Sequence, residues 1–486
     1  MKTTTAGVVG YLAAVAAAAK DARTFAVLRF NGQGFLTEGR MDPIVDPGKA
    51  ASHYHGIMGG SNFDITLQGD VLLDSNCTTA KIANDFSNYW VPALFFQDPN
   101  DQSKFTKVPL FYMNVYYFFE PTNDEVKAFP PGLKMLSGDT HTRNPPKSAA
   151  INLDPNQGDI QPVQFTCPRS SYNPASYPAN SDGSTAGMQD PQNEGAGAGF
   201  PLYPCDGYGS PLRQDIHFPS CYNPAVGLDD YKNNMAWPAT GTDGKQDCPE
   251  GYTHVPHIFY EVYWDTPQFD GKWTPDGKNQ PFVFSNGDAT GFSSHGDFVA
   301  GWQEDTLQTI IDTCNAGSLG MDTCPTIPGG LNQNQDCKID PVITEPVSIM
   351  GNSLGSSINK LPGDNEVTGW GRGGVTGGSV GSSSSGSDAA AAAVPEAVSS
   401  QAVAAQEVAT PTSAAKAQVT SAIESPAVAA ESVVTNAAGG METVWDVVTV
   451  TATETAYVDP TEAPQRRSHR HGHMARHAAH HAGERR

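Results

Sequence analysis

The clearest pattern in the chain is a set of short apolar runs separated by turn residues. The longest, residues 108–119, is rich in β-branched and aromatic residues, which is typical of a buried strand. Shorter runs of the same kind occur at residues 24–30, 89–96, 254–264 and 282–284. Short strands with Gly and Pro between them predict a mainly β fold, an antiparallel β-sandwich or jelly roll with long loops and few helices.

Two stretches depart from the strand pattern. The apolar residues of 302–314 recur at helical spacing: Leu307, Ile310, Ile311 and Cys314. This spacing predicts a helix. Residues 142–214 are rich in Pro, Asn, Ser, Gly and Asp and hold few apolar residues. We therefore expect a long loop there, which in a compact domain is either functional or mobile.

Composition divides the chain into five segments. Residues 1–22 have a short basic start and a small apolar run, which predicts a secretory signal peptide; neither that run nor any later one is long enough for a transmembrane helix. Residues 23–361 form the expected β-rich domain. A Gly/Ser linker follows at 362–388, then a disordered stalk of Ala, Ser, Thr and Val at 389–464, and a basic, His-rich tail at 465–486.

Charge and cysteine content narrow the compartment and the partners. The net charge is -23 although the tail holds six Arg, and such an acidic chain argues against nucleic acid as a partner. Eight cysteines after a signal peptide predict disulfides in a secreted protein, extracellular or associated with a cell wall: Cys77, Cys167, Cys205, Cys221, Cys248, Cys314, Cys324 and Cys337. Among them we expect Cys221 to pair with Cys248, and we expect a monomer. Asn76 begins an Asn-Cys-Thr glycosylation sequon, which predicts a glycoprotein.

The stretch 41–63 carries the first candidate chemistry. It contains two histidines, His53 and His55, and the pair Gly59-Gly60. If residues 52–57 are extended, the two histidines project from one face of a strand. The glycine pair allows a tight turn or a close approach of backbone.

His295-Gly-Asp297 repeats the spacing of two, so its imidazole and carboxylate would share a strand face. A carboxylate near an imidazole can orient the ring and hold it protonated. The first hypothesis places His53 or His55 near His295 and Asp297, with one histidine as general base and another group as acid on an extracellular polysaccharide. Further carboxylates are available at Asp42, Asp46, Asp139 and Asp215.

Three alternatives use the same chain differently. His53, His55 and His295, with Asp297, are suitable ligands for a divalent metal such as zinc or copper. A glycan-binding protein without catalysis would use tryptophan rings, although burial is the commoner role of this residue: Trp90, Trp237, Trp264, Trp273 and Trp302. A structural wall protein would need only the stalk and the tail, whose six histidines also suit divalent metals.

Other histidines and serines have a plainer interpretation. His254 and His257 are expected to pack in the core or on the surface rather than act in a site. Three serines lie near the residues named above but have no Gly-x-Ser-x-Gly motif around them: Ser61, Ser220 and Ser294.

A family resemblance rests on the stretch 41–63 and on a series of short motifs. In chain order these are Tyr89-Trp-Val-Pro, Pro131-Gly-Leu-Lys-Met, Gly138-Asp, Phe218-Pro-Ser-Cys, Cys248-Pro, Val255-Pro, Ser294-His-Gly-Asp-Phe and Gly301-Trp. Over roughly residues 23–340 the chain resembles a secreted domain of fungi and actinobacteria, the domain-of-unknown-function family numbered nineteen ninety-six, which in fungi sometimes accompanies WSC-type carbohydrate-binding modules. The resemblance implies a fungal, secreted protein and no particular activity. Relatives carry two histidines where residues 228–238 read Leu-Asp-Asp-Tyr-Lys-Asn-Asn-Met-Ala-Trp-Pro and have none.

Overall fold

The computed structural model describes residues 22–32, 34–207, 211–345 and 355–370, which all belong to one compact unit. Within these ranges the protein is mainly β, as the pattern predicts, with antiparallel sheets and a single α-helix. The expected stalk and tail, the signal peptide up to residue 21 and the linker from residue 371 lie outside the described residues.

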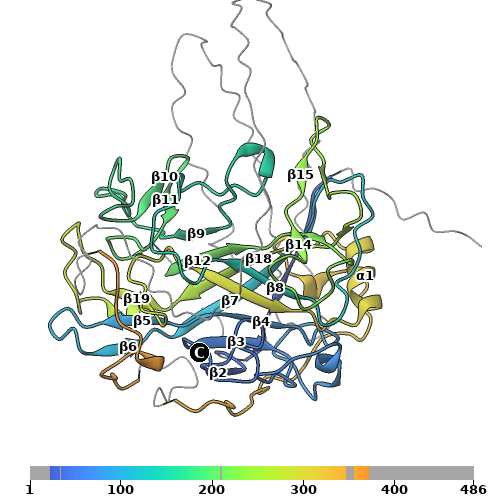
Figure 1. Ribbon diagram of the computed structural model, residues 1–486, viewed down its shortest axis with the longest axis horizontal. Coiled ribbons are helices and arrows are strands. Elements are labelled where there is room, and N and C mark those ends of the chain that lie inside the picture. The colour runs from blue at the N-terminus through green and yellow to red at the C-terminus, as the bar shows by residue number, and fades with distance from the viewer. Residues whose placement is uncertain (1–21, 33, 208–210, 346–354, 371–486) are drawn as a thin grey trace, which may run out of the picture. The chain divides into compact units, whose positions relative to one another are not determined.

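The larger sheet has seven antiparallel strands (Figure 1). In spatial order they are β1 (Thr24–Arg29), β7 (Leu110–Phe119), β18 (His257–Trp264), β12 (Leu212–His217), β9 (Val163–Thr166), β11 (Asn193–Ala198) and β10 (Met188–Asp190). Three of these strands, β1, β7 and β18, lie within apolar runs that predicted strands, and they pair side by side.

The expectation of one long loop over residues 142–214 is wrong. This stretch supplies β9, β10 and β11 and the first residues of β12, and so builds one side of the larger sheet. The sequence pattern did not predict these strands because β9 and β10 are only four and three residues long, and β11 consists of small and polar residues, Asn-Glu-Gly-Ala-Gly-Ala. Backbone hydrogen bonds to a neighbouring strand hold such a segment without an apolar alternation.

Of the two main sheets, the smaller has five antiparallel strands and lies against the seven-stranded sheet (Figure 1). In spatial order they are β2 (Thr37–Gly39), β3 (His55–Gly59), β4 (Asn88–Pro92), β20 (His295–Val299) and β8 (Lys134–Gly138). Side chains alternate across each strand, so one face of this sheet packs on the larger sheet and the other points away from it.

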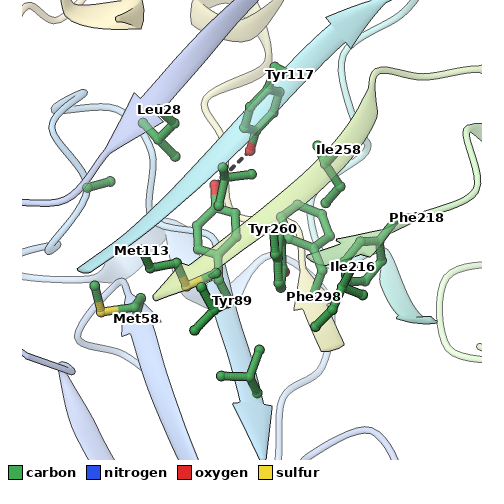
Figure 2. Packing of buried hydrophobic residues seen from close by; sticks show 14 of the residues in the cluster. Leu28, Met58, Tyr89, Met113, Tyr117, Ile216, Phe218, Ile258, Tyr260 and Phe298 are labelled. Atoms are coloured by element: carbon green, nitrogen blue, oxygen red, sulfur yellow. Dashed lines mark hydrogen bonds between the residues drawn. The ribbon is translucent and has the colours of Figure 1, made fainter. Parts of the chain in front are cut away.

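The main core fills the space between the two sheets (Figure 2). Tyr89 of β4 and Phe298 of β20 meet Tyr117 of β7 and Tyr260 of β18 there, all fully buried. The hydroxyl groups of Tyr89 and Tyr117 hydrogen bond to each other at 2.7 Å, as the dashed line in Figure 2 shows. These two hydroxyl groups are therefore paired inside the core.

Shorter elements surround the sheets. The remaining strands are β5 (Leu94–Gln97), β6 (Phe105–Lys107), β13 (Cys221–Tyr222), β14 (Met235–Ala236), β15 (Ala239–Thr240), β16 (Gln246–Asp247), β17 (Thr253–His254) and β19 (Phe282–Phe284). Short 3-10 helices are η1 (Val71–Asp74), η2 (Pro155–Gln157), η3 (Thr266–Phe269), η4 (Met321–Thr323) and η5 (Pro362–Asp364). The predicted helix is confirmed as α1 (Glu304–Thr313), which buries Leu307, Ile310 and Ile311.

All eight cysteines form disulfides. The pairs are Cys77–Cys337, Cys167–Cys205, Cys221–Cys248 and Cys314–Cys324, which include the expected Cys221–Cys248 pair. Asn76, beside the first of these bonds, is exposed. No helix in the described part of the chain has the length and apolar character needed to cross a membrane.

Candidate metal centre

The predicted site residues gather on the outer face of the five-stranded sheet. In β3, Met58 points into the core between the sheets, so His55, an odd number of residues away, points to the other side. In β20 the same alternation turns Phe298 inward and both His295 and Asp297 outward. The spacing of two in His295-Gly-Asp297 therefore places both side chains on one strand face, as predicted.

The loop before β3 covers this outer face and contributes two more side chains. Asp42 begins the loop, and its Oδ1 accepts hydrogen bonds from the backbone N–H groups of Ile44 at 2.9 Å and Val45 at 3.0 Å. Ile44 then packs in a second apolar cluster with Trp90 of β4. The loop thus closes over the sheet with Asp42 at one end and His53 at the other.

The three histidines come together from segments far apart in the sequence. The Nε2 atoms of His53 and His295 lie 3.1 Å apart. The ring centroids of His53 and His55 are 4.3 Å apart, and those of His55 and His295 are 5.9 Å apart. One ligand atom from each histidine lies within 4.8 Å of the other two, and the same holds for the set Asp42, His55 and Asp297.

Two of the rings are oriented by partners that the sequence did not reveal. Nδ1 of His295 lies 2.7 Å from the backbone oxygen of Ser293, which can only accept, so that nitrogen carries the proton. Nε2 of His295 therefore carries a lone pair, which faces Nε2 of His53 at hydrogen-bonding distance. Nδ1 of His53 lies 2.9 Å from Oγ of Ser52. Such partners typically orient the histidine ligands of metals. Asp297 does not play the orienting role proposed for it.

Electrostatics keep the three rings neutral. Burial lowers the pKa of His295 to about 4, and it lowers the pKa values of His53 and His55 well below their ordinary value, with neighbouring histidines adding to the effect. For His55 the backbone of Met41 acts in the opposite direction. The rings therefore offer lone pairs at neutral pH, and His295 is not held protonated by Asp297.

The carboxyl groups show the complementary effect. Burial, followed by the charge of Asp42, raises the pKa of Asp297 well above its ordinary value. Burial also raises the pKa of Asp42 to about 6, against its two backbone hydrogen bonds. A nearby positive charge would favour the ionised form of both groups.

Several polar atoms of the cluster are buried without a hydrogen bond of good geometry in the described structure. They are both carboxylate oxygens of Asp297 and both ring nitrogens of His55. All five side chains of the cluster belong to residues that are 4 % exposed or less. This set of neutral imidazoles and buried carboxyl groups has the ligands and the unfilled bonding capacity of a metal centre.

A segment from the end of the described chain supports the site. The side-chain amide of Asn365 donates to the backbone oxygens of Ser52 at 2.8 Å and of Ser285 at 3.0 Å. Trp370 packs edge-on against Phe292, so contacts with the domain continue past residue 361. Asn365 thereby holds the backbone next to His53, and no sequence pattern pointed to it.

The other carboxylates proposed as reserves supply no ligand atom to the cluster, although the charge of Asp139 acts to raise the pKa of His295. Asp46 accepts from the backbone of Ser52 and pairs with Lys49. Asp139 is on an exposed loop, and Asp215 pairs with Arg213 on the larger sheet. Of the tryptophans proposed to stack on sugars, three are fully buried and act in packing: Trp90, Trp264 and Trp302.

His254 and His257 are buried and hydrogen bonded, in accord with their packing interpretation. His254 also joins Ser220, at 3.5 Å, to Asp124, at 3.3 Å, in the order of a catalytic triad. Ser220 is only 1 % exposed, and the group adjoins the Cys221–Cys248 disulfide. We assign this network to stability.

Fold and site together define a mainly β, disulfide-bonded domain with a buried His/Asp cluster on one sheet. Residues 42–302 match the family described as Domain of unknown function (DUF1996), and the chain belongs to that family. The matched region includes all five residues of the cluster. Neither the curated proteins nor the solved structures contain a match.

Proposed function

We propose that this protein binds a divalent transition-metal ion through His53, His55 and His295, with Asp42 and Asp297 beside the ion. The observation that carries the proposal is the set of buried polar atoms on His55 and Asp297 that have no hydrogen bond of good geometry. A buried polar group without a partner costs about 1–3 kcal/mol, more when it is charged. Several such groups facing one another are explained if a cation is their common partner.

The geometry fits an ion of the zinc or copper class. Two nitrogens that bind one zinc ion at about 2.0–2.1 Å lie about 2.8–3.4 Å apart for bond angles of about 90–110°. The two Nε2 atoms of His53 and His295 lie within this range at 3.1 Å. Imidazole nitrogens favour zinc, copper, iron and nickel over calcium and magnesium.

Burial favours a closed metal centre over direct catalysis on a polymer. Structural metal sites are enclosed by protein ligands, whereas catalytic sites keep a position open. Because His55, His295 and Asp297 are fully buried, a polysaccharide has no direct access to them. We propose that the ion ties the loop that bears Asp42 and His53 to strands β3 and β20. The hypothesis of a histidine general base has less support from this geometry.

The setting of this activity is extracellular. Four disulfides and the expected signal peptide support secretion, and glycosylation at the exposed Asn76 accords with it. A cell-wall location would follow from the expected stalk and basic tail, and we propose it on that ground.

Metal analysis of the full chain tests the proposal. The six tail histidines are first replaced by alanine, because they would bind metal themselves: His469, His471, His473, His477, His480 and His481. The protein is loaded with Zn²⁺ or Cu²⁺, desalted and measured by elemental analysis. We expect about one equivalent of tightly bound metal, in line with one set of three histidines.

Single variants locate the ion. His55→Ala and His295→Ala should each lose the metal, whereas His141→Ala, at an exposed histidine outside the cluster, should retain it. A folded, tail-substituted protein that takes up neither ion would disprove the proposal. So would equal metal content in all three variants.

A further inference from the structure

A cleft of about 400 Å³ lies beside the metal centre, bordered by the loop 138–146, by residues 160–165 and by short segments at 198–199 and 291–292. Its volume is within the range of small-molecule sites. We propose that this cleft binds a neutral, hydroxyl-rich chain, a segment of polysaccharide. The proposal goes beyond the metal centre and does not depend on it.

The charge of the cleft excludes an anionic ligand. Among the described residues that line it there is no Lys or Arg, and Asp139 is its only ionisable side chain. Arg143 belongs to the same loop, but its guanidinium is turned to other partners: it donates to the backbone oxygens of Thr142 at 2.8 Å and Asn286 at 3.1 Å. Lys147, next to the lining residue Pro146, pairs with Asp159 at 2.5 Å, which offsets its charge. Together with a net charge of -23, this disfavours a phosphate, sulfate or uronate as ligand.

The hydrogen-bonding groups of the cleft suit hydroxyls. The side-chain amide of Asn144 is exposed and makes no hydrogen bond within the described chain. Gln161 uses its Nε2 to donate to the backbone oxygen of Val163 at 2.7 Å, which leaves its carbonyl oxygen as an acceptor. An amide both donates and accepts, and so does a sugar hydroxyl.

Rigid apolar rings make up much of the remaining wall. Pro145, Pro146 and Pro162 line the cleft and are each partly exposed. Proline has little conformational freedom to lose on binding, so such a surface is already ordered for its ligand. Apolar proline rings beside amide groups suit a sugar ring, which presents C–H groups on its faces and hydroxyls around its edge.

A strand backbone separates the cleft from the metal centre. Gly138, in the wall of the cleft, pairs with His295 in the β8–β20 ladder. A Cβ atom on Gly138, whose φ is +88°, would lie 2.2 Å from the backbone oxygen of Ser294 and 3.0 Å from Cβ of His295. A ligand in the cleft would therefore approach the backbone of His295 and not its ring. The cleft and the metal centre can thus be tested separately.

Calorimetric titration of the full-length protein tests the cleft. The probes are soluble hexaoses of β-1,4-glucose, β-1,3-glucose and β-1,4-N-acetylglucosamine, with an oligogalacturonate as the anionic probe and a proline-rich peptide as the alternative neutral ligand. We expect at least one hexaose to bind. The double variant Asn144→Ala/Gln161→Ala should weaken that binding about tenfold or more, and the oligogalacturonate should not bind.

The matched control is Asn100→Ala, at an exposed asparagine outside the cleft, which should leave binding unchanged. Thermal melting confirms that the variants fold. The proposal is overturned if no hexaose binds, if only the anion or the peptide binds, or if the double variant binds as tightly as wild type. Metal content is measured on the same samples, so a metal-loaded protein that binds no hexaose rejects this inference and leaves the metal centre intact.

Discussion

The two faces of the five-stranded sheet use buried polar groups in opposite ways. On the face toward the larger sheet, hydroxyls have partners: Tyr89 donates to Asp85 at 2.7 Å, and Trp302 donates to the hydroxyl of Tyr117 at 2.9 Å. On the outer face, the carboxylate of Asp297 and both nitrogens of His55 have none of good geometry. Burial is equally deep on both faces.

This difference in hydrogen bonding distinguishes the inner face, which belongs to the core, from the outer face, which carries the candidate site. Folding selects strongly for paired buried polar groups, since each unpaired group costs free energy. Unpaired atoms that cluster on one face, among residues typical of metal ligands, therefore support the proposed metal ion as their partner. Asp297 takes part in both faces. Its backbone oxygen accepts a hydrogen bond from Tyr260 at 2.8 Å in the core, while its side chain belongs to the proposed metal centre.

The largest effect should come from breaking the inner face. Phe298 is fully buried and packs on Tyr89 and Phe129 at ring distances of 5.3 and 5.1 Å. Phe298→Ala removes these contacts and leaves a cavity, so the free energy of unfolding should fall by about 3–5 kcal/mol. Urea unfolding measures the loss. Metal stoichiometry of the folded variant should stay at the wild-type value, and a simultaneous loss of metal would show that the two faces are not separate.

The next effect concerns pH and the inner face. Burial raises the pKa of Asp85 from 3.8 to about 7. Between these pH values the folded state keeps a proton that the unfolded state releases, so this contribution to stability is present at acidic pH and is lost as pH rises through 7. The linkage amounts to roughly 4 kcal/mol at most. Asp85→Asn should flatten the dependence of stability on pH between about 4 and 7.

Urea unfolding at several pH values checks this expectation. The exposed Asp70→Asn serves as control and should retain the wild-type slope. An unchanged slope in Asp85→Asn would mean that Asp85 is ionised in the folded protein.

A third substitution, on the outer face, should raise the stability of the metal-free protein and weaken metal binding. Asp297→Leu removes the unpaired carboxyl, so the metal-free protein should gain about 1–3 kcal/mol in unfolding free energy. The same variant should bind metal far more weakly. Thermal melting with and without chelator compares it with wild type. A variant less stable than chelated wild type, with its metal affinity intact, would assign Asp297 to packing.

The smallest effect concerns the residue that positions the site. Asn365→Ala removes the hydrogen bond to the backbone of Ser52, next to His53. Metal affinity should fall about tenfold, as for other groups that orient metal ligands. Competition with a chromogenic chelator measures the affinity. Asn359→Ala, at an exposed position of the same segment, is the control and should not change it.

The apolar pattern predicted much of the fold because periodicity is a local property. β7 and β18 bury long aromatic runs, and α1 repeats its apolar residues at helical spacing. Spacing also predicted that His295 and Asp297 share a strand face. β11 consists of glycine, alanine and polar residues, so it has no apolar alternation that would predict a strand. It becomes a strand because it pairs with neighbouring strands in the sheet.

The sequence therefore predicted part of the composition of the proposed metal centre, but it did not predict how its residues come together. Histidine type and spacing marked His53, His55 and His295 as candidates, but a separation of 242 residues between the first and the last leaves their contact to the packing of the sheet. Their partners Ser52, Ser293 and Asn365 belong to common polar residue types without a motif. Only the tertiary structure brings these groups together, because hydrogen bonding and burial depend on distances in space rather than on positions along the chain.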